Sequence, residues 1–224
     1  GSGTSPSVFT YAPGLNFFGS DSFVVEVSDG VLSDLIIVNV NVSAVDDPPV
    51  ISQGTGPLTI SMSENGNPTP WAAPELNATD VDSATSALTW SISSPATSGL
   101  AEVSGSGISP SIVNYTPATD FNGNDSFVVQ VSDGTLTDNI TVNVNLTAIN
   151  DAPVITQGTG PLSVSMSEDG NPTAWTAPDL NATDVDTASA SLTWSVLSAA
   201  NSGIATVSGS GASPLTFTYA PAAN

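Results

Sequence analysis

A repeat of 104 residues constrains this chain more than any other feature of its sequence. Phe23-Val24-Val25 returns as Phe127-Val128-Val129, and Trp90 returns as Trp194, each 104 positions later. No insertion or deletion interrupts the spacing, and the 224 residues make two periods plus the first 16 residues of a third. A unit of about 100 residues can fold as a domain, whereas solenoid units are much shorter. The sequence therefore predicts tandem domains.

The domain boundaries are predicted from the best linker signal. Val45-Asp46-Asp47-Pro48-Pro49 follows a long alternating segment, and Ile149-Asn150-Asp151-Ala152-Pro153 occupies the same place one repeat later. Proline ends a strand because it cannot donate to the ladder. With the boundaries placed at these two linkers, residues 1–46 are the C-terminal part of one domain, residues 47–150 are a complete domain, and residues 151–224 are the N-terminal part of another. We expect the chain to be a window on a longer array.

The complete repeat shows the pattern of a β-sandwich. Turn residues punctuate it every 8–16 positions, and apolar residues alternate between them without a helical period. The fold class predicted is all-β, with tandem immunoglobulin-like seven-stranded Greek-key sandwiches. The seven strands are expected near residues 50–63, 75–80, 88–92, 100–103, 112–115, 127–131 and 140–146.

The composition limits the chemistry open to this chain. It holds 21 acidic residues and no Lys, Arg, His or Cys, for a net charge of -21. Zinc ligation, a Ser-His-Asp system, a P-loop and binding to nucleic acid or anionic membranes all need the missing residues. We expect no enzyme and no membrane insertion, since no apolar run approaches the roughly 18 residues of a membrane span. Carboxylates, amides and carbonyls remain, and these suit Ca²⁺.

Strand direction predicts where the acidic residues gather. Each strand of an antiparallel sandwich reverses the chain, so residues that follow alternate strands lie at the same end. One junction is expected to collect Glu64, Asp120, Asp125, Asn150, Asp151, Asp184 and Asp186, with Asp120 and Asp125 in the same turn and all but Asp120 as metal ligands. The preceding junction is expected to collect Asp21, Asp46, Asp47, Asp80, Asp82 and Asp133.

So many carboxylates at one place would repel one another without a cation. Ca²⁺ takes six to eight oxygen ligands, and such a junction could hold two or three ions. The alternative is that these residues only form turns, since Asp and Asn bond their own backbone there. That alternative fits the Asp-Gly pair at Asp133 best and the pair Asp80-Val81-Asp82 least.

The motifs also resemble a known family. Ala182-Thr183-Asp184-Val185-Asp186 is similar to the calcium motif of cadherin repeats, and Asn150 to Val154 is similar to the cadherin linker. The segments from Tyr115 to Phe127 and from Val131 to Gly134 resemble bacterial cadherin-like tandem repeats of giant adhesins. The resemblance implies an extracellular rod stiffened by calcium. It assigns metal roles to Glu64, Asp80, Asp82 and Asp133.

The function predicted is structural. The chain is interpreted as a segment of a bacterial extracellular fibre or adhesin stalk, on the cell surface, with neighbouring repeats or identical subunits as partners. An alternative is a glycan-binding or homophilic adhesion module that uses Trp71 and Trp175 in Pro-flanked loops. Polymerisation by strand exchange stays open beside one covalent array. Paired carboxylates would also suit a glycosidase, but nothing marks a cleft.

Overall fold

The computed structural model describes residues 5 and 8–223. Nearly all regular structure is β, apart from two short 3-10 turns, η1 (Thr85–Ala87) and η2 (Ser189–Ser191). No helix in these residues is long and apolar enough to span a membrane. The chain divides into two compact units: residues up to 61, 71–118 and 124–145 form one, and 62–70, 119–123 and 146 onward form the other.

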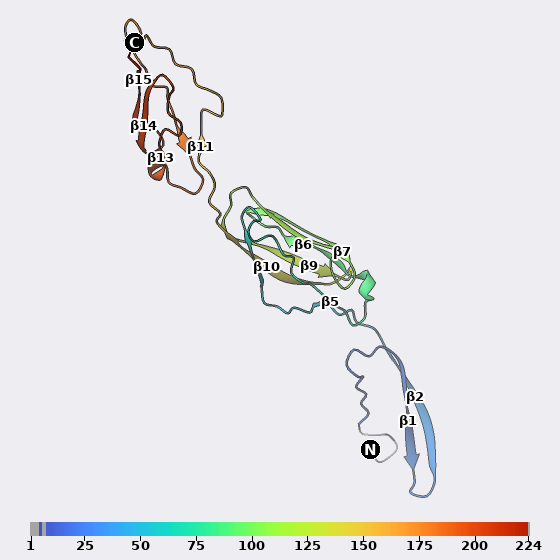
Figure 1. Ribbon diagram of the computed structural model, residues 1–224. Helices are drawn as coiled ribbons and strands as arrows, with labels where there is room; N and C mark the ends of the chain where they lie inside the picture. Colours follow the sequence, from blue (N-terminus) through green and yellow to red (C-terminus); the bar gives the residue numbers. More distant parts are fainter. Residues whose placement is uncertain (1–4, 6–7, 224) are drawn as a thin grey trace. The chain divides into compact units, whose positions relative to one another are not determined.

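A lone hairpin occupies the N-terminal part of the first unit (Figure 1). Strands β1 (Gly19–Ser28) and β2 (Ser33–Val42) pair antiparallel from Gly19 opposite Val42 to Ser28 opposite Ser33. Their turn is closed by Asp29, whose Oδ1 accepts the N–H groups of Val31 and Leu32, both at 2.8 Å. The sheet contains these two strands alone among the described residues.

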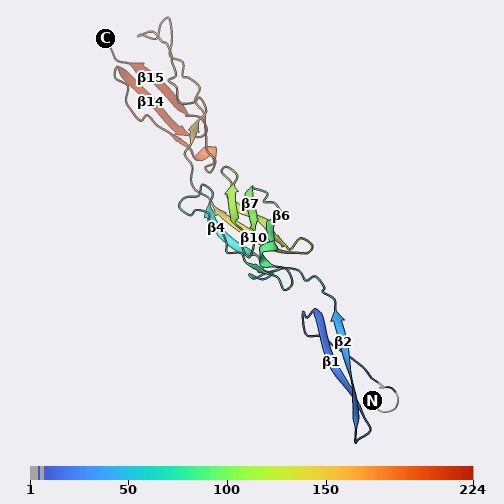
Figure 2. The ribbon, with the colours of Figure 1, turned by 90° about the vertical axis from the view of Figure 1, so that its right-hand side faces the viewer.

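The central repeat contains the complete sandwich. Its main sheet has the order β4-β10-β9-β6-β7-β8, of which Figure 2 labels β4, β6, β7 and β10, and a small sheet pairs β3 with β5. The strands are β3 (Val50–Ile51), β4 (Leu58–Ser63), β5 (Ala78–Thr79), β6 (Thr89–Ser94), β7 (Gly99–Ser106), β8 (Ile112–Pro117), β9 (Gly123–Ser132) and β10 (Thr137–Thr147). The predicted sandwich is confirmed.

The prediction of one strand over 50–63 is wrong. A turn divides that segment, with the N–H of Gly54 donating to the Ile51 carbonyl at 3.1 Å and Gly54 at a φ of 84°. Positive φ suits glycine, which has no Cβ to clash. The chain therefore leaves the small sheet after β3 and joins the main sheet as β4.

The core of the central repeat lies under the strands that alternation predicted. Phe127, Val129 and Val131 of β9 are almost fully buried, and so are Ile140, Val142, Val144 and Leu146 of β10. Trp90 is also buried, and its indole N–H donates to the Gly107 carbonyl at 2.9 Å. Trp90 is therefore a core residue of the central repeat.

The C-terminal part of the chain repeats the front of the sandwich. Strands β11 (Val154–Ile155) and β12 (Ala182–Thr183) form one small sheet, and β13 (Thr193–Trp194), β14 (Gly203–Ser210) and β15 (Thr216–Pro221) form another. The domain boundaries at 46/47 and 150/151 stay a prediction.

Candidate metal centre

The linker after β10 is tied to the loop after β12 by carboxylates of the Asp-Val-Asp motif. The N–H of Asp151 donates to Oδ2 of Asp186 at 2.6 Å. The loop itself is held by Asp184, whose Oδ1 accepts the N–H groups of Asp186 at 3.0 Å and Thr187 at 2.7 Å. The two aspartates of the motif therefore have separate roles, since Asp184 closes its own loop and Asp186 holds the linker.

Glu64 approaches the same linker from the end of β4. Its side chain is buried, its Oε1 accepts the N–H of Ile149 at 2.6 Å, and its Oε2 accepts the side-chain amide of Asn122 at 3.3 Å. The N–H of Glu64 donates to the Thr147 carbonyl at 3.1 Å. Backbone and side chain thus fix this carboxylate where β10 passes into the linker.

Three carboxylates converge here. One oxygen each from Glu64, Asp151 and Asp186 lies within 4.8 Å of the others. Calcium–oxygen distances of 2.3–2.6 Å place ligands on opposite sides of an ion about 4.6–5.2 Å apart, so one Ca²⁺ fits among these oxygens. Oδ2 of Asp151 is buried and has no hydrogen-bond partner among the described residues. A buried acceptor without a donor is unfavourable unless a cation supplies the missing interaction.

The local charges agree with a cation site. Burial raises the pKa of Asp151, and the negative charges of Asp120, Asp186 and Glu64 raise it further; a hydrogen bond with the Asn65 side chain opposes them. A raised carboxyl pKa means that the ionised form is disfavoured. The site therefore has surplus negative charge, which a divalent cation would neutralise.

The preceding linker, in the first unit, repeats the backbone arrangement. The N–H of Asp47 donates to Oδ2 of Asp82 at 3.1 Å, and Oδ1 of Asp80 accepts the N–H groups of Asp82 at 3.0 Å and Ser83 at 2.8 Å. The hydrogen bond from Asp47 favours ionised Asp82, yet desolvation and the charges of Asp80 and Asp46 outweigh it and raise the pKa of Asp82.

Two further buried oxygens in the first unit have no donor. Oδ1 of Asp133 accepts the N–H groups of Thr135 at 2.6 Å and Leu136 at 2.8 Å, as expected for a turn former. Its Oδ2, like Oδ2 of Asp80, is buried and meets no hydrogen-bond donor in the part of the chain that is described. In each of these two side chains, Oδ1 therefore holds the turn, and Oδ2 is left as a candidate metal ligand.

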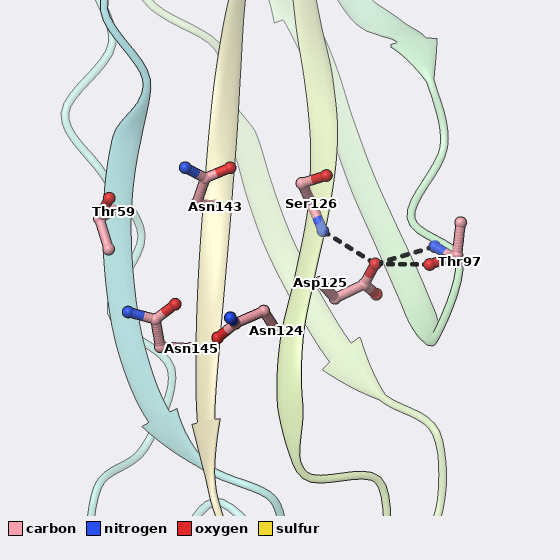
Figure 3. Close-up of a pocket in the computed structure, with 7 residues that line it drawn as sticks. All are labelled: Thr59, Thr97, Asn124, Asp125, Ser126, Asn143 and Asn145. Atoms are coloured by element: carbon pink, nitrogen blue, oxygen red, sulfur yellow. Dashed lines mark hydrogen bonds between the residues drawn. The ribbon is translucent and has the colours of Figure 1, made fainter.

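Asp125 lies elsewhere, in β9 and not in the turn that the sequence predicted (Figure 3). Oδ1 accepts the Thr97 N–H at 3.0 Å and Oδ2 accepts the Ser98 N–H at 2.9 Å and the Tyr115 hydroxyl at 2.9 Å. Burial alone would raise its pKa, but these bonds and one from the Ser126 N–H outweigh burial and lower it. The placement in a turn was wrong because β9 begins at Gly123, so alternation directs Asp125 inward with Phe127.

Asp21 is the equivalent residue of the hairpin. It lies in β1, where its Oδ2 accepts the Tyr11 hydroxyl at 2.8 Å. Among the described residues, neither Asp21 nor Asp125 belongs to a group of three carboxylates close enough to share a metal ion. Asn150 is exposed and donates its amide to the Asp151 carbonyl at 2.9 Å, which leaves its own oxygen available.

The loop tryptophans are engaged within their own segments. The indole N–H of Trp71 donates to the Val113 carbonyl at 3.2 Å, and its ring lies 5.8 Å from that of Tyr115. Trp175 makes the equivalent hydrogen bond to the Phe217 carbonyl at 3.4 Å. Both side chains are half-buried, so they serve packing.

Sequence reasoning missed the residues that support the cluster. Asn122 and Asn65 were not singled out, whereas Asp120 was predicted to lie at this junction but was not among the predicted ligands. Asp120 has a φ of 57°, which Asn and Asp tolerate better than most residues. The sequence signal for Asp120 was its position in a turn at the same end of the domain as Glu64. No sequence signal distinguished Asn65 and Asn122 from the many other asparagines of the chain.

The central repeat is similar to a known bacterial family. Residues 46–145 match the family model of the bacterial Ig domain, which agrees with the predicted immunoglobulin-like sandwich. No curated protein matches the chain.

Solved structures resemble the chain only loosely. Extracellular cadherin domains 1–5 of protocadherin gamma B2 share 15% identity at a TM-score of 0.47, over 88% of this chain and 38% of that one. Domains 4–9 of surface layer protein SbsC share 16% at a TM-score of 0.31, over 90% and 35%. An endo-fucoidan hydrolase of glycoside hydrolase family 107 shares 15% at a TM-score of 0.36, over 99% and 34%. The chain spans less than half of each of these structures.

Proposed function

We propose that this chain is a structural segment of a bacterial extracellular fibre or adhesin stalk, in which Ca²⁺ bound beside each interdomain linker stiffens the chain. The observation that carries the proposal is the buried Oδ2 of Asp151. It lies in a linker and has no hydrogen-bond donor among the described residues, and Asp151 is grouped with Glu64 and Asp186 by their carboxylate oxygens. Ca²⁺ would supply the positive charge that this chain, without Lys or Arg, cannot supply itself.

Two sets of ligands follow from the placement. Around the second linker we assign Glu64, Asn150, Asp151, Asp184 and Asp186, with Asp120 as a nearby charge. Around the first linker we assign Asp46, Asp47, Asp80, Asp82 and Asp133. Asp21 and Asp125 are left out of both sets because strand position and hydrogen bonding give them a different role.

Stiffening is the mechanical consequence of where the ligands sit. Asp151 is part of the linker, Glu64 ends β4, and Asp186 lies in the loop after β12. A cation shared by these three side chains would add to the hydrogen bonds at Ile149 and Asp151 and restrict the backbone dihedral angles of the linker further. The repeated bond from Asp47 to Asp82 predicts the same restriction one repeat earlier.

The proposal includes an extracellular location and the absence of enzymatic activity. Ca²⁺ sites of extracellular modules have dissociation constants of about 10⁻⁴–10⁻³ M, and such sites fill only where calcium is millimolar. Glu64 and Asp186 each accept a backbone N–H of the linker, which supports a structural role for these carboxylates. The glycan-binding alternative has no supporting observation, since Trp71 and Trp175 pack within the chain.

The decisive experiment is a thermal melt of the 224-residue chain in EDTA and in rising concentrations of CaCl₂. At 100 times the dissociation constant, one site adds about 2.7 kcal/mol to the free energy of unfolding. Asp151→Asn should abolish most of the response of its linker. Glu102→Gln, which removes one charge from an exposed position on β7, is the matched control and should respond like the parent chain. Identical melts in EDTA and calcium would reject the proposal.

A further inference from the structure

The chain contains two Asn-Gly pairs, Asn65-Gly66 and Asn122-Gly123, and both lie beside the candidate metal centre. One pair follows Glu64 at the end of β4, and the other stands where β9 begins. Both asparagines are exposed. Gly66 has a φ of 69° and Gly123 a φ of 119°, which glycine adopts readily because it has no Cβ.

The side-chain amides of both asparagines reach carboxylates of the cluster. Nδ2 of Asn122 donates to Oε2 of Glu64 at 3.3 Å. The side chain of Asn65 hydrogen-bonds to Asp151 and favours its ionised form, against burial and the neighbouring charges. All four residues belong to the second compact unit. The two amides therefore supply donors to a cluster that otherwise carries surplus negative charge.

An Asn-Gly pair is chemically labile, because the glycine nitrogen can attack the side chain of the asparagine before it. The nitrogen forms a bond to Cγ and gives up its proton, the bond from Cγ to Nδ2 breaks, and ammonia leaves. Water then opens the resulting imide ring at either carbonyl and leaves aspartate or isoaspartate. The reaction consumes water, releases ammonia and needs no other reactant. Glycine favours it because no Cβ obstructs the attack.

The next repeat already carries the acid at one of these positions. Asp169 stands 104 positions after Asn65 and is likewise followed by a glycine, with a φ of 70°. The glycine N–H donates to the carbonyl of Ser63 at 2.8 Å in one repeat and to that of Ser167 at 2.9 Å in the next. The turn has the same backbone geometry with either residue, so it accommodates the aspartate product.

A role in turn formation explains part of this pattern. Asn and Gly are common in turns, because Asn bonds to its own backbone and Gly supplies a positive φ. This role accounts for the two glycines. It does not account for the direction of both amides toward carboxylates of one cluster, and the turn at Asp169 shows that the backbone does not require an amide.

We propose that Asn65 and Asn122 are sites of spontaneous deamidation, and that the reaction converts two hydrogen-bond donors of the candidate metal centre into carboxylates. Each conversion adds a negative charge beside Glu64 or Asp151. Without a cation, the added repulsion lowers the stability of the fold. With Ca²⁺, the added oxygens raise the affinity, since calcium affinity depends on the number of charged ligands. The effect on affinity rests on the proposed function, whereas the deamidation itself does not.

Bound Ca²⁺ should slow the reaction. The N–H of Gly66 donates to the Ser63 carbonyl, and the nitrogen must lose this proton to attack, so the turn must open first. Glu64 precedes Asn65 in the chain and accepts the amide of Asn122, so an ion held by Glu64 restrains both pairs. The chain therefore gains calcium affinity during the time that it spends without calcium.

The first experiment follows deamidation by peptide mapping, after incubation of the 224-residue chain at mildly alkaline pH in EDTA and in calcium. Trypsin cannot be used, because the chain has no Lys or Arg. Chymotrypsin cuts after aromatic residues such as Trp71, Phe121 and Phe127, which places the two Asn-Gly pairs on separate peptides. Mass spectrometry detects the exchange of NH2 for OH, and chromatography separates the aspartate and isoaspartate products.

Each of these peptides also carries an internal control. Asn67 precedes a proline, whose nitrogen has no hydrogen to give up, and Asn124 precedes an aspartate, which has a Cβ. In EDTA we expect Asn65 and Asn122 to react at least ~10-fold faster than these two controls, since glycine alone leaves the attack unobstructed. Calcium should slow the reaction at both Asn-Gly pairs.

The second experiment measures the consequence in variants that imitate the aspartate product. Asn65→Asp with Asn122→Asp is compared with Asn67→Asp with Asn124→Asp, which adds the same two charges two residues further along. In EDTA the first variant should melt at a lower temperature than the second. In isothermal titration with CaCl₂ the first should bind at least ~3-fold more tightly than the parent chain. The second should bind within about twofold of the parent, because exposed charges contribute little.

A third variant tests whether the reaction itself changes the affinity. Asn65→Gln with Asn122→Gln keeps an amide at each position, but the longer side chain must close a larger ring and reacts far more slowly. During incubation in EDTA the parent chain should gain calcium affinity in step with the product measured by peptide mapping. The Gln variant should keep its initial affinity.

Three results would overturn the proposal. One is deamidation of Asn65 and Asn122 at the rate of Asn67 and Asn124. Another is an equal melting temperature of the two Asp variants in EDTA, since the added charges would then not face the carboxylates. The third is a chain that binds calcium with the same affinity before and after deamidation. Identical melts of the parent in EDTA and calcium would instead reject the proposed function, and the rates in EDTA would still decide the modification.

Discussion

Asp125 and Asp151 are the same kind of residue one short segment apart, and the fold treats them in opposite ways. Asp125 is 6% exposed and receives backbone N–H groups and a tyrosine hydroxyl. Oδ2 of Asp151 is buried without a donor among the described residues, and for Asp151 as a whole burial and the neighbouring carboxylates outweigh one hydrogen bond with the Asn65 side chain. The pKa of Asp125 is accordingly lowered and that of Asp151 is raised.

The difference separates two uses of a buried charge. A carboxylate with a full set of donors stabilises the fold by itself, because its charge is met by dipoles already in place. A carboxylate that faces like charges lowers the stability of the fold unless a cation binds beside it. Only the second kind makes the stability of the structure depend on a divalent cation. Asp125 is therefore assigned to the sandwich and Asp151 to the proposed metal centre.

The strongest way to break this comparison is Asp125→Ala. The Thr97 and Ser98 N–H groups and the Tyr115 hydroxyl would lose their acceptor inside the sandwich, and we expect a loss of about 3–5 kcal/mol. Urea denaturation followed by tryptophan fluorescence measures it, with the same loss in EDTA and in calcium. Asp21→Ala removes the equivalent, exposed residue and should change stability far less. A loss that appears only in calcium would place Asp125 in the metal centre.

Asp151→Asn probes the other side of the comparison. In EDTA we expect a slightly higher melting temperature, since the variant removes repulsion with Asp120, Asp186 and Glu64. In calcium we expect the variant to lose most of the roughly 2.7 kcal/mol that one site contributes at 100 times its dissociation constant. Isothermal titration gives the number of sites. Destabilisation in EDTA would show that Asp151 is held by donors, as Asp125 is.

Tyr115→Phe removes one donor from Asp125 and should cost about 1–1.5 kcal/mol at neutral pH. Burial, and then the hydrogen bond to Asp125, raise the pKa of Tyr115 far above its ordinary value. The unfolded chain therefore loses this proton first, and the parent should lose stability as the pH rises above about 10. The variant should lack that part of the alkaline loss. Parallel curves for the two proteins would contradict the assignment.

The smallest expected effect is a reversal in the direction in which stability changes with pH. In EDTA, the raised pKa of Asp151 means that the folded chain holds this proton more tightly, so stability should increase as the pH falls from 7 toward the ordinary carboxyl value of 3.8. Below that value the lowered pKa of Asp125 reverses the trend. In saturating calcium the increase in stability between pH 7 and 3.8 should disappear, because a proton on Asp151 would then compete with the bound ion. Melting curves between pH 3 and 7 test both branches.

Much of this structure could be predicted from the sequence. The alternation of Phe127, Val129 and Val131 fixed the buried face of β9, and the reversal of direction at each strand placed Glu64 at the same end as the linker. These features are local or follow from counting strands. The division of the first predicted strand at Gly54 could not be predicted, because one glycine in a polar segment does not show which sheet each half of the strand will join.

The roles of the individual carboxylates were not accessible in the same way. The donors that hold Asp125 come from residues 97 and 98, which lie 28 and 27 positions earlier in the chain. The amide of Asn122 that supports Glu64 lies 58 positions away. Nothing in the composition distinguishes these residues from the many other polar residues around them.

The sequence by itself determined that the chain is a tandem array of all-β repeats with negative charge and no cations of its own, because periodicity, alternation and composition are written directly in it. The tertiary structure alone decided which carboxylates meet N–H groups and which meet one another. Ionisation depends on the groups within a few ångströms of each oxygen, and only the packed chain brings those groups together.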